Sequence, residues 1–211
     1  MPTGINSIAK RVLGNIVKDT NAREKQTAES APARDITQIM HSAGVPNRYL
    51  PATLEKHFSN IKPDWSKGGF CLRGMTGCGK STLAAALLRD RFEQDELLTS
   101  KDVAWIGVLD YMSRIKSATH NQSKERPYDI LQGYRKKKLL VIDDLGKQRS
   151  HDWDKSELIA LIWQAYDQKQ DLIITTQKKL RELDMYESAL ASRLSTLSDI
   201  PLKEVDRRAE P

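Results

Sequence analysis

The amino-acid sequence predicts an α/β fold in which a parallel β-sheet is covered by helices on both faces. Five short apolar runs alternate with stretches that have the spacing of helices. Continuous apolar runs, rather than alternating patterns, are typical of parallel strands that are buried on both sides. A glycine-rich loop follows the first run and a pair of acids ends the third, as expected at the carboxyl edge of such a sheet.

The expected elements follow in chain order. Val-Ala-Trp-Ile-Gly-Val and Leu-Leu-Val-Ile are examples of the buried runs, and Ser-Thr-Leu-Ala-Ala-Ala-Leu-Leu is a strong helix former. We expect strands at 68–73, 103–108, 138–143, 171–176 and near 199–203, and helices at 80–93, 109–118, 127–134, 154–168 and 184–195.

The first 40 residues differ from the rest and are expected to form a separate N-terminal arm. Ile5, Ile8, Val12 and Ile16 fall at helical spacing with basic residues between them, which indicates a short amphipathic helix over 4–18. Residues 19–36 are polar and lack an apolar period, as in a linker. We therefore expect an arm at 1–40, which either docks on a partner or packs on its own domain, and a globular domain at 41–211.

The most informative motif is the loop at 74–81, which reads Gly-Met-Thr-Gly-Cys-Gly-Lys-Ser and satisfies the phosphate-loop pattern G-x-x-x-x-G-K-[ST]. Its glycines let successive N–H groups point into one concavity, and the following helix adds its positive dipole end. Lys80 would reach the β- and γ-phosphates, and Ser81 would bind Mg²⁺. The expected nucleotide-binding residues are Gly74, Met75, Thr76, Gly77, Cys78, Gly79, Lys80, Ser81 and Thr82.

Two acids end the third expected strand, at the edge of the sheet where the phosphate loop would also lie. Asp143 would hold Mg²⁺, largely through water, and Asp144 would orient and polarise the attacking water. Solvated acids that merely close a strand are the alternative, which the phosphate loop upstream disfavours. With these acids, the fold class becomes that of a P-loop NTPase that hydrolyses its nucleotide.

Two weaker signals complete the expected site. Thr176 and Gln177 end the neighbouring strand, where they could contact the γ-phosphate or the water. Arg193 lies late in a helix, where it could reach the nucleotide of a neighbouring subunit and stabilise charge in the transition state. An ordinary surface arginine near a helix C-terminus is the equally balanced alternative for Arg193.

Composition and charge limit the kinds of partner and the cellular location that we expect. The net charge of +6 favours acidic partners such as nucleic acid, and no apolar run has the length of a membrane span. Two cysteines are too few for a Cys₄ zinc site or a disulfide framework, and no secretory signal is visible, so a cytoplasmic location is expected. The basic run at 135–138 is expected to be a solvated strand entry, whereas Lys178, Lys179 and Arg181 could follow the phosphates of a single strand in a ring or spiral of subunits. Neither group has interleaved aromatics, so DNA binding through them would be salt-sensitive and indifferent to sequence.

Over residues 44–211 the chain resembles an AAA+ ATPase of the DnaC/IstB type, a group of bacterial and phage helicase loaders and transposition helpers. The resemblance is carried by GVPNRY at 44–49, the phosphate loop with its helix, LLVIDDLG at 139–146, DLIITTQ at 171–177 and SRL at 192–194. The chain departs from the family at two positions. Gln177 stands where Asn is usual, and Ala165, the residue before Tyr166, stands where Arg is frequent.

The resemblance implies an AAA+ fold of the ASCE class, with five parallel strands between helices and no C-terminal helical lid. It implies an ATPase with ATP and Mg²⁺ as cofactors, in which Asp144, Arg193, Gln177 and Thr176 act in catalysis and Ser81 and Asp143 hold the metal. It also implies a homo-oligomer joined through ATP, with a hexameric replicative helicase and single-stranded DNA as partners. The short arm resembles a phage or mobile-element version.

Three alternatives stay open on the sequence. An IstB-like helper of a transposase would share the fold and the ATP site. A small-molecule kinase would need a closing lid with arginines, and no such insertion is seen. An adaptor that binds nucleotide with negligible turnover would fit the departures at Gln177 and Ala165.

Overall fold

A computed structural model describes residues 34–120, 124–146, 152–178 and 188–202, and of residues 152–155, 188 and 189 only the helical backbone. The chain divides into two compact units, residues 1–35 and residues 36–211, and almost all described residues belong to the second. The amphipathic helix expected at 4–18 lies outside the described residues. Across the described ranges, no helix has both the length and the apolar composition that crossing a bilayer requires.

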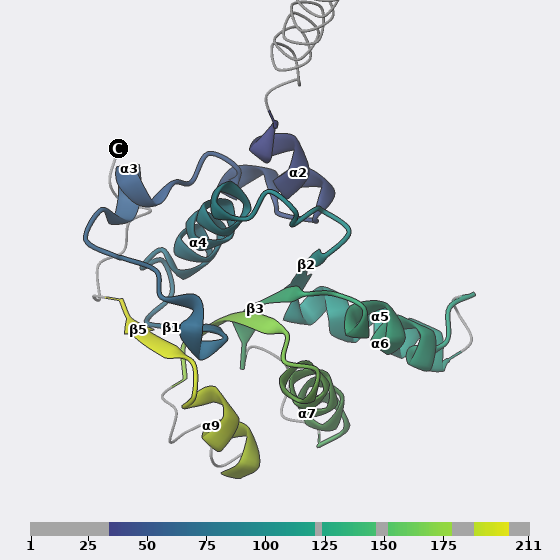
Figure 1. Ribbon diagram of the computed structural model, residues 1–211. Helices are drawn as coiled ribbons and strands as arrows, with labels where there is room; N and C mark the ends of the chain where they lie inside the picture. The colour runs from purple at the N-terminus through teal and green to yellow at the C-terminus, as the bar shows by residue number, and fades with distance from the viewer. Residues whose placement is uncertain (1–33, 121–123, 147–151, 179–187, 203–211) are drawn as a thin grey trace, which may run out of the picture. The chain divides into compact units, whose positions relative to one another are not determined.

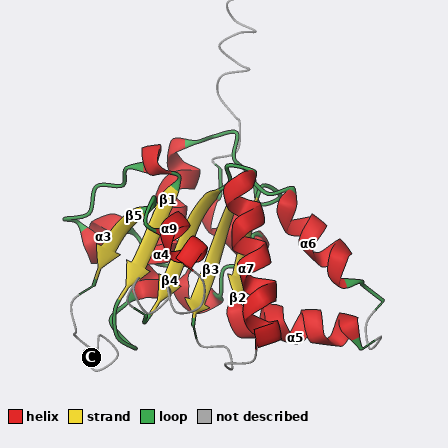
Figure 2. Ribbon diagram, turned by 90° about the horizontal axis from the view of Figure 1, so that it is seen from below, coloured by secondary structure: helices red, strands yellow, loops and turns green. Residues whose placement is uncertain are grey.

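The second unit is built on a five-stranded sheet in which every pairing is parallel. Figure 2 shows its strands side by side, in the spatial order β2-β3-β4-β1-β5. The strands are β1 (Gly69–Arg73), β2 (Val103–Gly107), β3 (Leu139–Leu145), β4 (Asp171–Thr176) and β5 (Ser198–Pro201). This is the predicted α/β fold, and each strand lies within two residues of its expected start.

Helices cover both faces of the sheet (Figure 1). One face packs against α2 (Ile36–Ser42), α3 (Leu54–Phe58) and α4 (Lys80–Gln94), and the other against α5 (Val108–Thr119), α6 (Pro127–Arg135), α7 (Asp152–Asp167) and α9 (Ser188–Leu194). Two short 3-10 turns, η1 (Asn47–Tyr49) and η2 (Trp65–Lys67), lie before β1.

The core consists of two apolar clusters, one on each side of the sheet. Successive residues of a strand point to opposite faces, so Phe70 and Leu72 enter the cluster beside α4 while Cys71 enters the cluster beside α7. All three side chains are at most 2% exposed. Burial on both sides explains why β1 reads as a continuous apolar run.

The globular domain begins earlier than the sequence predicted. The expected boundary between residues 40 and 41 falls inside α2, and Met40 is fully buried in the core. Arg89 of α4 fixes this N-terminal segment, because its guanidinium donates to the carbonyl oxygen of Ala52 at 3.0 Å, to that of Leu50, and to Thr37 Oγ1 at 3.2 Å. The segment 36–52 is therefore part of the domain.

Candidate nucleotide-binding site

The phosphate loop joins β1 to α4 at the carboxyl edge of the sheet. Gly77 and Gly79 have φ angles of 85° and 92°, in the left-handed region where glycine is favoured. At Gly74 a Cβ would lie only 2.6 Å from Cys78 Sγ, so the loop closes tightly on itself. Cys78 is 2% exposed and fills the inside of the turn. The glycine and cysteine positions thus follow from the close packing of the loop.

Lys80 is held against the loop that precedes it. It is the first residue of α4 and only 5% exposed, and its ammonium donates to the carbonyl oxygens of Gly74 at 2.9 Å and Met75 at 2.7 Å. These contacts keep the charge at the mouth of the loop, where the phosphates of a nucleotide would meet it.

The two expected metal ligands, Ser81 and Asp143, are in direct contact. Ser81 Oγ donates to Asp143 Oδ1 at 2.8 Å, and Thr175 Oγ1 donates to the same oxygen at 2.6 Å. The Thr175 hydroxyl also accepts from the N–H of Asp144 at 2.8 Å. Sequence reasoning missed Thr175, whose side chain is fully buried and orients the Asp143 carboxylate.

A β-bulge brings the second acid to the same site. Between the pairs Ile142–Ile174 and Leu145–Thr176, β3 has two residues where β4 has one. Asp144 takes up the extra length with a φ of 67°, a conformation that aspartate tolerates better than most residues. In a regular strand, neighbouring side chains would point to opposite faces. The bulge instead lets Asp144 line the cavity while Asp143 lies against Ser81.

The two residues that end β4 have different surroundings. Gln177 lines the cavity as expected. Thr176 does not: it is fully buried, its hydroxyl donates to the Leu145 carbonyl at 2.8 Å and accepts from the N–H of Lys178 at 3.1 Å. The predicted catalytic role of Thr176 is therefore wrong in this arrangement, because its side chain is committed to closing the sheet beyond the bulge.

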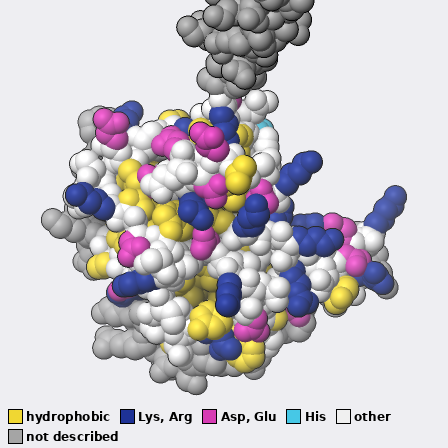
Figure 3. Space-filling model, viewed as in Figure 1, with side chains coloured by type: hydrophobic (Ala, Val, Ile, Leu, Met, Phe, Trp, Pro, Cys, Tyr) yellow, Lys and Arg dark blue, Asp and Glu magenta, His cyan; other side chains and the backbone are white. Residues whose placement is uncertain are grey.

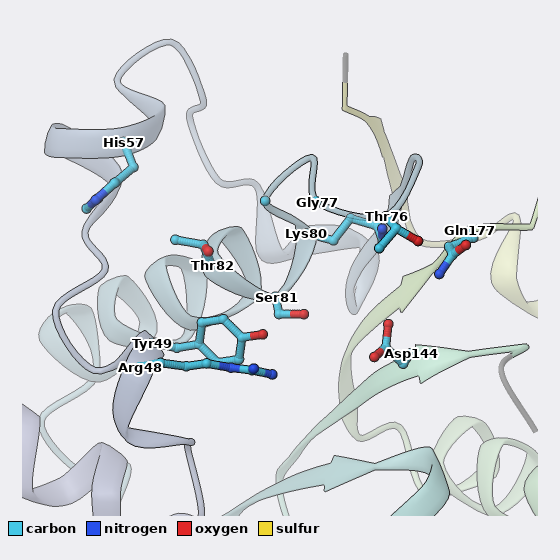
Figure 4. Close-up of a pocket in the computed structure, with 11 residues that line it drawn as sticks. Arg48, Tyr49, His57, Thr76, Gly77, Lys80, Ser81, Thr82, Asp144 and Gln177 are labelled. Carbon is cyan, nitrogen blue, oxygen red and sulfur yellow. The ribbon is translucent and has the colours of Figure 1, made fainter. Parts of the chain in front are cut away.

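Together these elements surround a cavity of about 680 Å³ (Figure 4). Its lining includes three residues that the sequence analysis did not single out individually, namely Arg48, Tyr49 and His57. The signal that could have found the first two was their place in the segment GVPNRY. Of the nine expected nucleotide-binding residues, six line the cavity: Thr76, Gly77, Gly79, Lys80, Ser81 and Thr82. Gly74, Met75 and Cys78 belong to the loop but do not line the cavity.

The comparisons with known proteins agree with this geometry. Residues 64–194, more than half of the chain, match the model of a family described as IstB-like ATP binding protein. The chain belongs to the IstB-like ATP-binding proteins. The resemblance to DnaC/IstB-type AAA+ ATPases is thereby confirmed, and with it the predicted fold.

Solved structures show the same fold at low sequence identity. A DnaC helicase loader is 22% identical with a TM-score of 0.59, and the match covers 75% of this chain and 100% of that one. DnaI is 15% identical with a TM-score of 0.55, and the match covers 75% of this chain and 94% of that one. The replication initiator DnaA bound to AMPPCP and single-stranded DNA is 14% identical with a TM-score of 0.58, and the match covers 76% of this chain and 51% of that one.

A curated relative is also a DnaA. The chromosomal replication initiator protein DnaA of Neisseria gonorrhoeae (strain ATCC 700825 / FA 1090) is 27% identical over 179 residues, which is 83% of this chain. The aligned region is 32% of that protein, so the chain spans about a third of the length of this relative.

This IstB-like protein has a donor set that suits magnesium. A serine hydroxyl and an aspartate carboxylate are hard oxygen ligands, and Ser81 and Asp143 already lie 2.8 Å apart. Among the described residues there is no cluster of three or more His, Cys, Asp or Glu side chains that could hold a metal ion. With two protein oxygens, the pair fits a cation that takes its remaining ligands from water and phosphate oxygens.

Arg193 of this IstB-like protein does not lie at its own cavity. Its guanidinium stacks over the rings of Trp163 at 4.5 Å and Tyr166 at 5.3 Å, both on α7. It is half-buried there and does not line the nucleotide cavity. The predicted role of Arg193 in catalysis therefore requires a second copy of the chain.

Cys71 beneath the loop is a packing residue. Burial, together with the nearby Asp199 carboxylate, raises the pKa of its thiol to about 12, and Arg73 opposes this shift. The thiol is therefore neutral at physiological pH, and with the buried Cys78 it forms no disulfide.

Proposed function

We propose that this protein is an ATP-dependent loader of a replicative DNA helicase. One observation carries the proposal: Lys80, Ser81 and Asp144 converge on one cavity, in a fold that matches a DnaC helicase loader over that chain's whole length. The coarser conclusion, an ATP-binding protein of the DnaC/IstB type, follows from the family itself.

The polar residues at the cavity and beside it would have distinct tasks. Lys80 would exchange its carbonyl contacts for the β- and γ-phosphates, and Ser81 and Asp143 would hold Mg²⁺. When bound, the cation would neutralise charge that develops on the phosphate oxygens. Asp144, turned into the cavity by the bulge, would accept a proton from the attacking water, and Gln177 would contact the γ-phosphate or that water.

Arg193 would complete the site of a neighbouring copy. A half-buried cation that does not line its own cavity suits action across an interface between subunits. Trp163 and Tyr166 hold its guanidinium in place through cation–π contacts. ATP would then join two copies, and hydrolysis would loosen the interface between them.

The partners are inferred from the same relatives. We infer that the N-terminal arm, which ends at residue 35 once α2 is assigned to the domain, docks on the helicase and that basic side chains of the domain bind single-stranded DNA. On the face in Figure 3, basic and acidic side chains are interspersed rather than gathered into one stripe. Several cations are already paired, such as Arg114 with Glu125 and Lys138 with Asp102. Weak, salt-sensitive DNA contacts therefore fit better than a dedicated groove.

A mixing experiment tests the shared site. Lys80→Ala should abolish ATP binding, whereas Arg193→Ala should bind ATP but lose hydrolysis by about 10³-fold. An equimolar mixture should regain activity, because the Lys80→Ala copies still offer Arg193 to the Arg193→Ala sites. Phosphate release measures this, with Arg126→Ala, an exposed arginine of another surface, as the matched control.

Two outcomes would contradict the proposal. Full hydrolysis by either single variant would remove the assigned roles, and a mixture no more active than its components would place Arg193 outside the shared site.

Pull-downs then identify the partner. A hexameric helicase supports the loader, while a transposase supports the IstB-like helper, a second candidate that the match to the IstB-like family favours. Loss of the partner on deletion of residues 1–35, which leaves α2 in the domain, with ATP binding retained, would assign docking to the arm.

A further inference from the structure

We propose that Arg48 is a second phosphate-binding cation of this site, held in position by Tyr49 and Trp105. The inference deepens the proposed function, on which it rests, by assigning a residue outside the phosphate loop to the recognition of the triphosphate. Arg48 belongs to η1, which precedes β1 by some twenty residues in the chain.

The position of Arg48 is the first argument. It lines the same cavity as Lys80, Ser81 and Asp144. Figure 4 shows its side chain extended beneath the Tyr49 ring, with the guanidinium directed toward the space between Ser81 and Asp144. That space lies beside the expected metal pair, where the terminal phosphates of a nucleotide would be.

The second argument is how the side chain is held. The Arg48 guanidinium lies 4.6 Å from the centre of the Tyr49 ring. The Tyr49 ring in turn stacks on Trp105 of β2, with centroids 5.8 Å apart and planes 29° from parallel. The N–H of Trp105 donates to the carbonyl oxygen of Ala43, which ties the strand to the segment that carries Arg48. An exposed arginine is thus pre-oriented by a stack anchored on the sheet.

The third argument concerns the hydrogen-bond donors of the Arg48 guanidinium. Among the described residues, the Arg48 guanidinium makes a ring contact but no hydrogen bond or ion pair. Lys80, by contrast, already donates to two carbonyl oxygens. A planar fork with five donors that faces a cavity suits the paired oxygens of a phosphate group.

The contacts of Tyr49 favour phosphate over the base as the target. A base in this part of the cavity would need an aromatic face, but Arg48 and Trp105 already contact the Tyr49 ring. The guanidinium itself points toward the residues expected to hold magnesium. We therefore assign Arg48 to the polyphosphate chain.

Competition binding tests the assignment, with a fluorescent ATP analogue as reporter and three competitors: ATP, ADP and inorganic tripolyphosphate. Arg48→Ala should weaken ATP and tripolyphosphate by a similar factor of about tenfold or more, as expected for one or two charge-assisted hydrogen bonds. Arg48→Lys should give an intermediate loss, because it keeps the charge but not the fork. Arg126→Ala, which changes an exposed arginine outside the cavity, should leave all three unchanged.

Substitutions of Tyr49 test whether its ring positions the Arg48 side chain or only stabilises the fold. Tyr49→Leu should weaken the same competitors less than Arg48→Ala does, while Tyr49→Phe, which keeps the ring, should retain affinity. The double variant Arg48→Ala/Tyr49→Leu should bind no worse than Arg48→Ala alone, since both remove one interaction. Thermal unfolding of each variant reports whether it is folded.

The outcomes distinguish this inference from the proposed function. Unchanged tripolyphosphate binding with weakened ATP binding in Arg48→Ala would assign Arg48 to the base and overturn the inference. Unchanged binding of all competitors would also overturn it, while the proposed function would stand as long as Lys80→Ala loses ATP. Retained ATP binding in Lys80→Ala would instead remove the proposed function itself.

Discussion

At the scale of single residues, the chemistry of this site depends on which of two adjacent threonines faces the acids. Thr175 bonds Asp143 and Asp144, whereas Thr176 bonds the backbone beyond the bulge. Both hydroxyls are buried, and in sequence the two residues are indistinguishable. The pairing of β3 with β4 decides which one supports the carboxylates.

We predict that Thr175→Val lowers the free energy of unfolding by about 1–3 kcal/mol, because the N–H of Asp144 loses its acceptor and Asp143 loses a donor. Hydrolysis at saturating ATP should fall further than ATP binding, since the acids are no longer oriented. Urea unfolding and phosphate release measure the two effects.

Thr176→Val is the matched control for that change. It removes an equally buried hydroxyl that contacts Leu145 and Lys178 rather than the acids. Its stability should fall by a comparable amount while hydrolysis per folded molecule is kept. An equal loss of hydrolysis in both variants would show that the effect comes from the sheet as a whole.

The residues of the site were predictable where a local motif encodes them. Lys80, Ser81 and Asp143 follow from the phosphate loop and from an apolar strand that ends in acids, and the structure brings them together. The bulge at Asp144 was not predictable, because it depends on two strands that are brought together only by folding. Arg48 and Tyr49 were missed individually for a similar reason, since their contact with the cavity is long-range.

At the scale of elements, length and burial decide what a sequence pattern can reveal. The strands and the long helices were predicted because each has an apolar run or a sustained helical period. The elements α2, η1 and α3 have seven, three and five residues, too few for a period to be recognised. They are fixed instead by tertiary contacts, such as the bonds from Arg89 to Leu50 and Ala52.

A pair of glycine substitutions should show opposite effects in two elements. A Cβ at Gly69 would lie 1.8 Å from the carbonyl oxygen of Leu172, and the residue has a φ of 125°, so Gly69→Ala must separate β1 from β4. We expect a loss of several kcal/mol in the free energy of unfolding.

Gly133 provides the contrast in α6. A Cβ there would meet nothing within 4 Å, and alanine is the better helix former by about 0.5–1 kcal/mol. Gly133→Ala should therefore stabilise the protein by up to that amount. Chemical denaturation of both variants measures the difference, and a Gly69→Ala variant as stable as the unchanged protein would contradict the packing described for β1.

At the scale of the whole molecule, the phosphate loop depends on the last described strand. β1 leads directly into the loop and pairs with β5, and the N–H of Leu202 donates to the carbonyl oxygen of Arg73 at 2.7 Å. The Arg73 and Asp199 side chains form an ion pair between the same two strands. The C-terminal strand therefore supports one side of the nucleotide site.

We predict that a chain ending at Leu197 unfolds at a lower temperature and loses ATP binding, because β1 is left as an unsupported edge. A chain ending at Leu202 keeps β5 and should retain both properties. Thermal unfolding and nucleotide binding compare the two. Equal ATP affinity in both chains would show that the loop holds its shape without β5.

The strand order also determines when during its synthesis the protein can bind ATP. Gly69 pairs with Leu172, about a hundred residues later, and Phe70 pairs with Ser198, so both partners of β1 leave the ribosome long after the phosphate loop does. Until then, the loop and Lys80 belong to a chain without its central strand pairs. A copy that is still being translated therefore has no finished nucleotide site, so under the proposed function only completed chains would enter an assembly joined through ATP.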